Sequence, residues 1–140
     1  MNIITDINFL DFRVAKLDFC VNDNPSHAKQ ATVRTEFKVR HECKGNRLKV
    51  HLTIFFKDKD APFSIHLEGV GLFELHRSFT EAEIEELSHS HCATMMFPYM
   101  RETIADISRR AGFPPLHIPQ IDFNQVFKQQ LSPANIHTLH

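Results

Sequence analysis

The chain has 140 residues, of which 42% are apolar and 24% charged, and its formal net charge is -1. This length and composition are typical of one soluble domain with its own core, so we expect a single domain over residues 1–140. The balanced charge argues against nucleic acid as a main partner, and no apolar run approaches the roughly 20 residues of a membrane span, so no membrane insertion is expected.

Three cysteines without a CxxC pair indicate reduced thiols in a cytoplasmic protein. The first residues carry two aspartates and no basic region, so they are not expected to form a secretory signal. The chain has 13 Phe, one Tyr and no Trp. Because Phe has no polar group, this surplus predicts either a Phe-rich core or additional apolar surface for an oligomer interface or a binding groove.

Alternation of apolar and polar residues predicts strands throughout the first half of the chain. Gly69 and Gly71 interrupt the last of these, which indicates a bulge or the close approach of another backbone. A turn at residues 44–46 predicts a hairpin between the second strand and the third. The loop at residues 22–30 is compatible with a tight turn or a crossover. The predicted strands cover about residues 12–21, 33–43, 47–57 and 63–75.

The second half changes to a period of 3.6 residues, which predicts helices. The first helix begins after Thr80, with Thr80 and Glu83 forming a capping box and Phe79 and Ile84 a hydrophobic staple. Strands followed by helices predict an α+β fold with an antiparallel sheet.

The second predicted helix, over residues 93–111, contains Pro98, which we expect to kink it between a shorter lead-in helix and the main one. Asp106 can pair with Arg110, and Gly112 and the prolines after it end the helix. Its apolar stripe consists of Met96, Met100, Ile104, Ile107 and Ala111.

A last helix begins after Asp122, which is expected to cap it, and ends at Ser132-Pro133. The residues that follow are expected to form a flexible tail. The apolar stripe of this last helix consists of Phe123, Val126, Phe127 and Leu131.

Ten histidines raise the question of a metal site. The densest cluster is HSHC at residues 89–92, where His89 and Cys92 share a helix face and His91 points elsewhere. A closed zinc site needs four ligands, and the other candidates are His41 and Cys43 on one strand face. We therefore expect no metal, no cofactor and no catalytic residue, and a metal-dependent enzyme built on these residues is the least favoured hypothesis.

The stretch FPYMRETIADISRRAGFPPLHIPQIDFNQVF, residues 97–127, resembles the SecB family of bacterial export chaperones. FSIHLEGVGLFEL, residues 63–75, resembles the fourth strand of that family. The resemblance extends over residues 12–131 and is specific over residues 97–127. It implies a four-stranded antiparallel sheet with helices packed on one face, assembled as a dimer of dimers.

The resemblance also implies an ATP-independent holdase that binds non-native polypeptide, either an export preprotein or an antitoxin, in a groove between the sheet and the last helix. The implied groove residues are Val33, Phe37, Val39, Phe123, Val126, Phe127 and Leu131. The homotetramer interface implied by the resemblance consists of Met95, Met96, Met100, Ile104 and Ile107. The alternative is an adaptor module that binds one folded partner.

The outer sheet face departs from the family pattern, in which an acidic patch docks the motor ATPase SecA. The matching positions carry no carboxylate, and a change from a carboxylate to Lys reverses the sign of a docking contact. Docking to SecA is therefore doubtful for this chain. These positions are Lys16, Cys20, Ser64 and His66.

Overall fold

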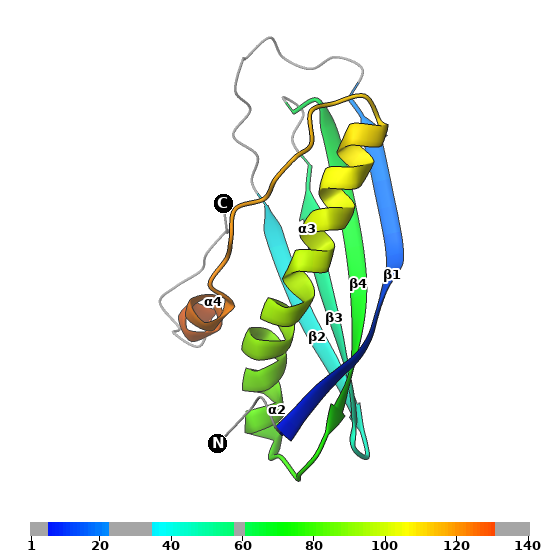
Figure 1. Cartoon of the computed structure of the whole chain (residues 1–140). Helices are drawn as coiled ribbons and strands as arrows, with labels where there is room; N and C mark the ends of the chain where they lie inside the picture. The colour runs from blue at the N-terminus through cyan, green and yellow to red at the C-terminus, as the bar shows by residue number, and fades with distance from the viewer. Residues whose placement is uncertain (1–5, 23–34, 58–60, 131–140) are drawn as a thin grey trace.

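Figure 1 shows a twisted sheet with a long helical run laid across one face. The computed structural model describes residues 6–22, 35–57 and 61–130; the expected flexible tail lies outside these ranges. The strands are β1 (Ile7–Val21), β2 (Glu36–Lys44), β3 (Arg47–Phe56) and β4 (Phe63–Leu75). The helical segments are α2 (Glu81–Leu87), the π-helical turn η1 (Ser88–Cys92), α3 (Ala93–Arg110) and α4 (Phe123–Gln130).

The four strands are antiparallel and lie in the order β1-β4-β3-β2, which confirms the predicted fold class. Strands β1 and β2 lie at opposite edges of the sheet, and the loop between them, for which two alternatives were left open, lies almost entirely outside the described residues. Lys44 pairs with Arg47 across the turn, and Gly45 there has a φ of 61° that suits glycine. The predicted hairpin is therefore confirmed.

Strand β1 begins at Ile7, earlier than alternation predicts. Its pairing with β4 shifts register between Phe9 and Asp11 and again between Val14 and Lys16. Each shift inserts one unpaired residue into β1, so the simple apolar–polar alternation is broken twice along the strand. A period-two pattern could follow only the part of β1 beyond these bulges.

The two glycines of β4 make room for α3. A Cβ atom at Gly69 would lie 2.5 Å from the Sδ atom of Met100, and one at Gly71 would lie 2.8 Å from the Sδ atom of Met96. The close approach comes from helix side chains rather than from another backbone, and the bulges lie in β1 rather than in β4.

The helical run is continuous from residue 81 to residue 110, with the predicted capping box at its start. The Glu83 N–H donates to Thr80 Oγ1 at 3.1 Å, and the Thr80 N–H donates to Glu83 Oε1 at 2.9 Å. The run continues as α-helix through Pro98, which is exposed. The helix type changes earlier, from α to π at Ser88–Cys92, and the expected bend at residues 97–98 stays a prediction.

The connector after α3 runs back from the end of the helix to α4, which lies beside β2 (Figure 1). Gly112 follows the helix with a φ of 96°, as the predicted stop requires. The fully buried Ser108 hydroxyl then accepts from the Leu116 N–H at 2.9 Å, which ties the connector to α3. Asp122 accepts from the Gln125 N–H at 3.2 Å and caps α4, as predicted.

Candidate functional site

Helix α4 lies beside the β2 edge of the sheet, at the lower left of Figure 1. It is anchored there by a cluster of three aromatic rings from three elements. The ring of Phe123 in α4 lies 5.8 Å from that of Phe37 in β2 and 5.3 Å from that of Phe97 in α3. Phe97 is fully buried and Phe123 is 2% exposed, so this cluster acts as the attachment point of the helix.

A second contact joins α4 to the sheet through η1. The ring of His89 lies 6.3 Å from the ring of His41 in β2 and 5.3 Å from the ring of Phe127 in α4. His89 Nδ1 lies 2.9 Å from the carbonyl oxygen of Glu85, and since a carbonyl only accepts, Nδ1 carries the proton. In the neutral ring, Nε2 is then the acceptor nitrogen.

Between these contacts a row of partly exposed side chains follows the inner side of β2, facing α4. Phe37, Val39 and His41 are half-buried there, and Val126 is half-buried on α4. We call these four residues with His89 the β2–α4 trough. Of the expected groove residues, Phe123 and Phe127 are almost enclosed, and the two at positions 33 and 131 lie outside the described residues.

The expected interface residues of α3 divide into two groups. Met96, Met100 and Ile104 are fully buried against the sheet of their own chain, so they belong to its core and have no surface left for a partner helix. Met95 and Ile107 are only partly buried and retain accessible surface. A helical stripe alone could not separate these groups, because it identifies a buried face without saying what buries it.

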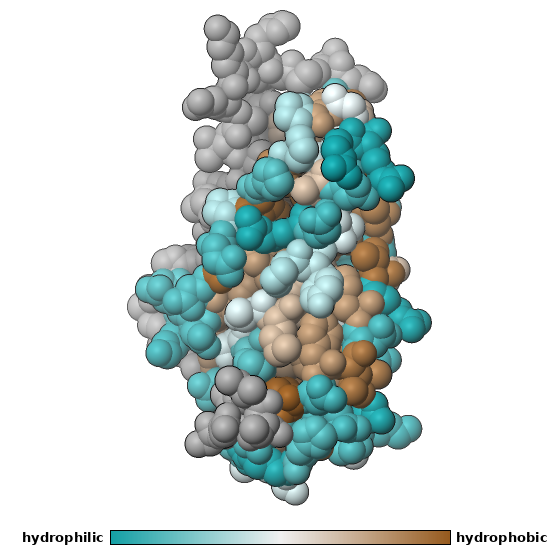
Figure 2. Space-filling model, viewed as in Figure 1, coloured by the Kyte–Doolittle hydropathy of each residue, from teal (hydrophilic) through white to brown (hydrophobic). Residues whose placement is uncertain are grey.

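An exposed apolar strip lies beside α3 on the β1 side of the molecule, and brown side chains gather on that side in Figure 2. Tyr99 of α3, 51% exposed, stacks on Phe12 of β1 with ring centroids 5.1 Å apart. Sequence analysis did not assign this surface, because it depends on which edge β1 occupies. The strip consists of Leu10, Val14, Leu17, Val21 and Tyr99.

The outer face of the sheet carries charges that neutralise one another. The β1–β4 register pairs Lys16 with Glu68 and Asp18 with His66. Lys16 and His66, which stand where the family pattern has carboxylates, therefore each have a carboxylate as a direct cross-strand neighbour. Asp18 Oδ2 lies 3.6 Å from Lys16 Nζ. Sequence analysis missed these neighbours because only the register brings them together.

The most enclosed of these outer carboxylates is Glu68. Its Oε1 lies 3.0 Å from His51 Nδ1 and 3.4 Å from Arg40. The hydrogen bond from His51, with a smaller contribution from Arg40, holds the pKa of Glu68 below its ordinary value. In the described part of this face, the carboxylates nearest Lys16 and His66 therefore stand next to basic side chains.

The residues of the HSHC cluster are placed differently from what a reactive or metal-binding centre requires. Cys92 is fully buried, and burial raises the pKa of its thiol, which disfavours the thiolate that a nucleophile or ligand requires. Burial also lowers the pKa of His91. Among residues 6–22, 35–57 and 61–130, no three His, Cys, Asp or Glu side chains are grouped to hold a metal ion.

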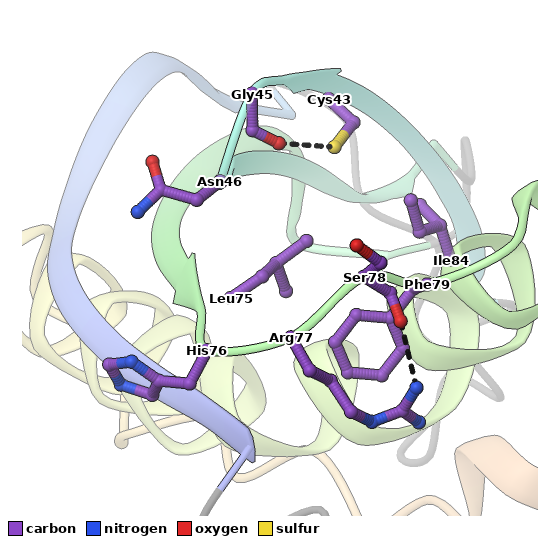
Figure 3. Close-up of a pocket in the computed structure, with 9 residues that line it drawn as sticks. All are labelled: Cys43, Gly45, Asn46, Leu75, His76, Arg77, Ser78, Phe79 and Ile84. Carbon is purple, nitrogen blue, oxygen red and sulfur yellow. Dashed lines mark hydrogen bonds between the residues drawn. The ribbon is translucent and has the colours of Figure 1, made fainter.

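An open pocket of about 450 Å³ lies at the end of the sheet, where the β2–β3 turn meets the start of α2 (Figure 3). Its prominent cation, Arg77, lies 3.1 Å from Asp6 and 3.3 Å from Glu83, and covers the ring of Phe79 at 3.8 Å. The guanidinium thus joins the residue before β1, the β4–α2 connection and the first turn of α2. This pocket is a structural junction whose positive charge is already neutralised.

Comparison of the structure with solved structures identifies the class of fold. It matches the Mycobacterium tuberculosis Rv1957 SecB-like chaperone, solved in complex with a ChAD peptide from the Rv1956 HigA1 antitoxin, with a TM-score of 0.75 and 20% identity. The match covers 85% of this chain and 93% of that one. A Streptococcus agalactiae protein of unknown function matches with a TM-score of 0.51 and 10% identity, over 82% of this chain and 98% of that one. The fold is SecB-like.

The chain belongs to the SecB family, since the family model described as "Preprotein translocase subunit SecB" matches residues 4–134. Proteins named "Protein-export protein SecB" from Burkholderia vietnamiensis and Burkholderia multivorans are 38% identical to it over 81 residues, 58% of this chain and 50% and 49% of theirs. The chain thus spans about half the length of these relatives. The resemblance noted in the sequence is confirmed, and none of these names describes an enzyme. Within the described part of the chain, no helix is long and apolar enough to cross a bilayer.

Proposed function

We propose that the protein is an ATP-independent holdase that binds non-native polypeptide in the β2–α4 trough and keeps it soluble in the cytoplasm. The observation that carries the proposal is the partial exposure of Phe37, Val39 and Val126 in a chain of the SecB family. Such side chains would otherwise be expected in a core. Aliphatic and aromatic surfaces make few directional demands, so they can accept many client sequences.

The remaining groove residues have supporting roles in this proposal. Phe123 and Phe127 hold α4 in place, and a client that lifts the helix would expose them. Val33 and Leu131 continue the same apolar series along the chain.

We propose further that the protein is a homotetramer whose interfaces include the exposed strip beside α3. Isolated exposed apolar residues are ordinary, but five together on β1 and α3 are typical of a surface that another chain covers. Met95 and Ile107 add to this surface from the exposed side of α3, whereas Met96, Met100 and Ile104 support the helix from below.

The client is either a preprotein for export or a dedicated antitoxin. The names of the Burkholderia relatives support the first, and the antitoxin peptide bound to the M. tuberculosis protein supports the second. The paired charges around Lys16, Asp18 and Glu68 favour the second, because a neutralised face differs from the acidic patch on which SecA is expected to dock.

The proposal is tested by aggregation of a reduced, chemically unfolded test protein at equimolar chaperone without nucleotide. The wild type should suppress light scattering, and Val126→Asp should reduce that suppression because it places a charge in the trough. Gln125→Glu adds the same charge at an exposed position of the same helix and should suppress aggregation as the wild type does. If the wild type binds folded partners but no unfolded test protein, the adaptor alternative replaces the holdase.

A further inference from the structure

The π-helical turn η1 contains one residue more than the packing of the helical run requires. Leu87 before it and Cys92 at its end are both buried, although they stand five positions apart. In an α-helix, residues with this spacing point about 140° apart, so one of them would leave the core. A π turn bonds residue i to residue i+5 and brings both onto one face.

The same burial could be achieved with one residue fewer. If any residue between Leu87 and Cys92 were absent, the two would stand four apart and share the face of a regular α-helix. The longer turn also has an unfavourable feature. The fully buried Ser88 hydroxyl finds no hydrogen-bond partner among the residues that the structure describes, which is destabilising. Sheet packing therefore does not explain the extra residue.

What the wider turn does provide is a side chain between the sheet and α4. His89 contacts the ring of His41 on one side and that of Phe127 on the other. Its Nδ1 is fixed by the carbonyl of Glu85, so the ring is held in one orientation. His89 therefore lies between β2 and α4, in contact with both.

We propose that the extra residue of η1 is a positioning device: it sets His89 as the floor of the trough and thereby sets the spacing between β2 and α4. This rests on the holdase function proposed above and specifies how its site is built. The floor suits an extended client segment with apolar side chains, and it offers the Nε2 acceptor of His89 to one N–H or O–H group of the client. The location of His89 in a π turn agrees with the frequent occurrence of such turns at functional sites.

The test is deletion of Ser90, with Ser90→Ala as the length-matched control that removes the same hydroxyl. Deletion should leave far-UV circular dichroism and the midpoint of thermal unfolding within a few degrees of the control. Affinity for a fluorescently labelled, reduced and alkylated test protein should fall about tenfold or more, as expected when a contact of about 1.4 kcal/mol is lost. Equal affinities of the deletion and Ser90→Ala would overturn the proposal.

A second variant applies if the deletion does not fold. His89→Ala keeps the length of the turn and should weaken binding of the same test protein about three- to tenfold, with stability unchanged. His91→Ala is its control, because it removes an imidazole of the same turn that has no ring contact with α4 in the described structure. Equal loss in both variants would refute the role of His89. A wild type that does not bind the test protein at all would instead refute the holdase function.

Discussion

The close contact between Gly69 and α3 predicts a measurable loss of stability on adding one methyl group. In Gly69→Ala the new Cβ would lie 2.5 Å from Met100 Sδ and 2.8 Å from Phe12 Cε2. Ordinary contacts of this kind are 3.4 Å or longer, so Met100 and Phe12 must each move by more than half an ångström. Overpacking of a dense core costs about 1–3 kcal/mol, and we expect a destabilisation in that range.

The contact can be isolated with a double-mutant cycle. Met100→Ala alone should destabilise by about 2–5 kcal/mol, because it leaves a cavity in the core. In the double variant the new methyl group occupies part of that cavity. The destabilisation of the double variant should therefore be smaller than the sum of the two single destabilisations by at least about 0.5 kcal/mol. Urea unfolding followed by circular dichroism at fixed protein concentration measures all three free energies.

Gly112→Ala is the control for this cycle. Gly112 has a positive φ but no atom near its missing Cβ, so alanine there is destabilising only through the backbone. Its effect should add to that of Met100→Ala without coupling. Additive effects of Gly69→Ala and Met100→Ala would refute the proposed packing of α3 on β4.

Three further predictions concern single groups. Thr80→Ala should lower the free energy of unfolding by about 1 kcal/mol in a urea titration, since it removes the capping box, and an unchanged value would contradict the cap. The folded state lowers the pKa of Glu68, so its ion pair stabilises the protein above the unfolded pKa, and this stabilisation is lost as pH falls through the folded pKa. In urea titrations at several pH values, Glu68→Gln should therefore show a smaller decrease in the free energy of unfolding toward acid pH than the wild type does. Exposed Cys20 and Cys43 should react quickly with a thiol reagent and buried Cys92 only on unfolding, whereas three fast thiols would contradict the burial.

Most of the fold could be predicted from the sequence because its signals are local. The Gly45 turn, the Thr80–Glu83 capping box and the Asp122 cap each act within a few residues, and the structure has all three. The start of β1 was missed because two bulges break the alternation that identifies a strand. The π turn was also missed, although the five-residue interval from Leu87 to Cys92, filled by SHSH, is a usable signal for it.

The candidate site was less predictable because exposure depends on long-range placement. Phe37 and Phe123 lie on equally apolar stripes, yet one is half-buried in the trough and the other is enclosed. Met96 and Met95 are adjacent in sequence and differ in the same way. His89 was considered only for metal binding or catalysis, because its contacts with His41 and Phe127 become visible only when three elements are assembled.

The position of β1 at the far edge of the sheet has a consequence for biosynthesis. β2, β3 and β4 are consecutive in the chain and can pair in turn as they leave the ribosome. In the described sheet β1 pairs only with β4, so Ile7 cannot pair until Leu75 has been synthesised. At about 5–20 residues per second, a ribosome needs roughly 3–11 s to make the segment between the end of β1 and the end of β4. During that interval Phe9, Phe12 and Phe19 have no sheet to join. Each new copy of the chain therefore passes through the condition of the unfolded clients it is proposed to bind, and mature copies could shelter it until β4 is made.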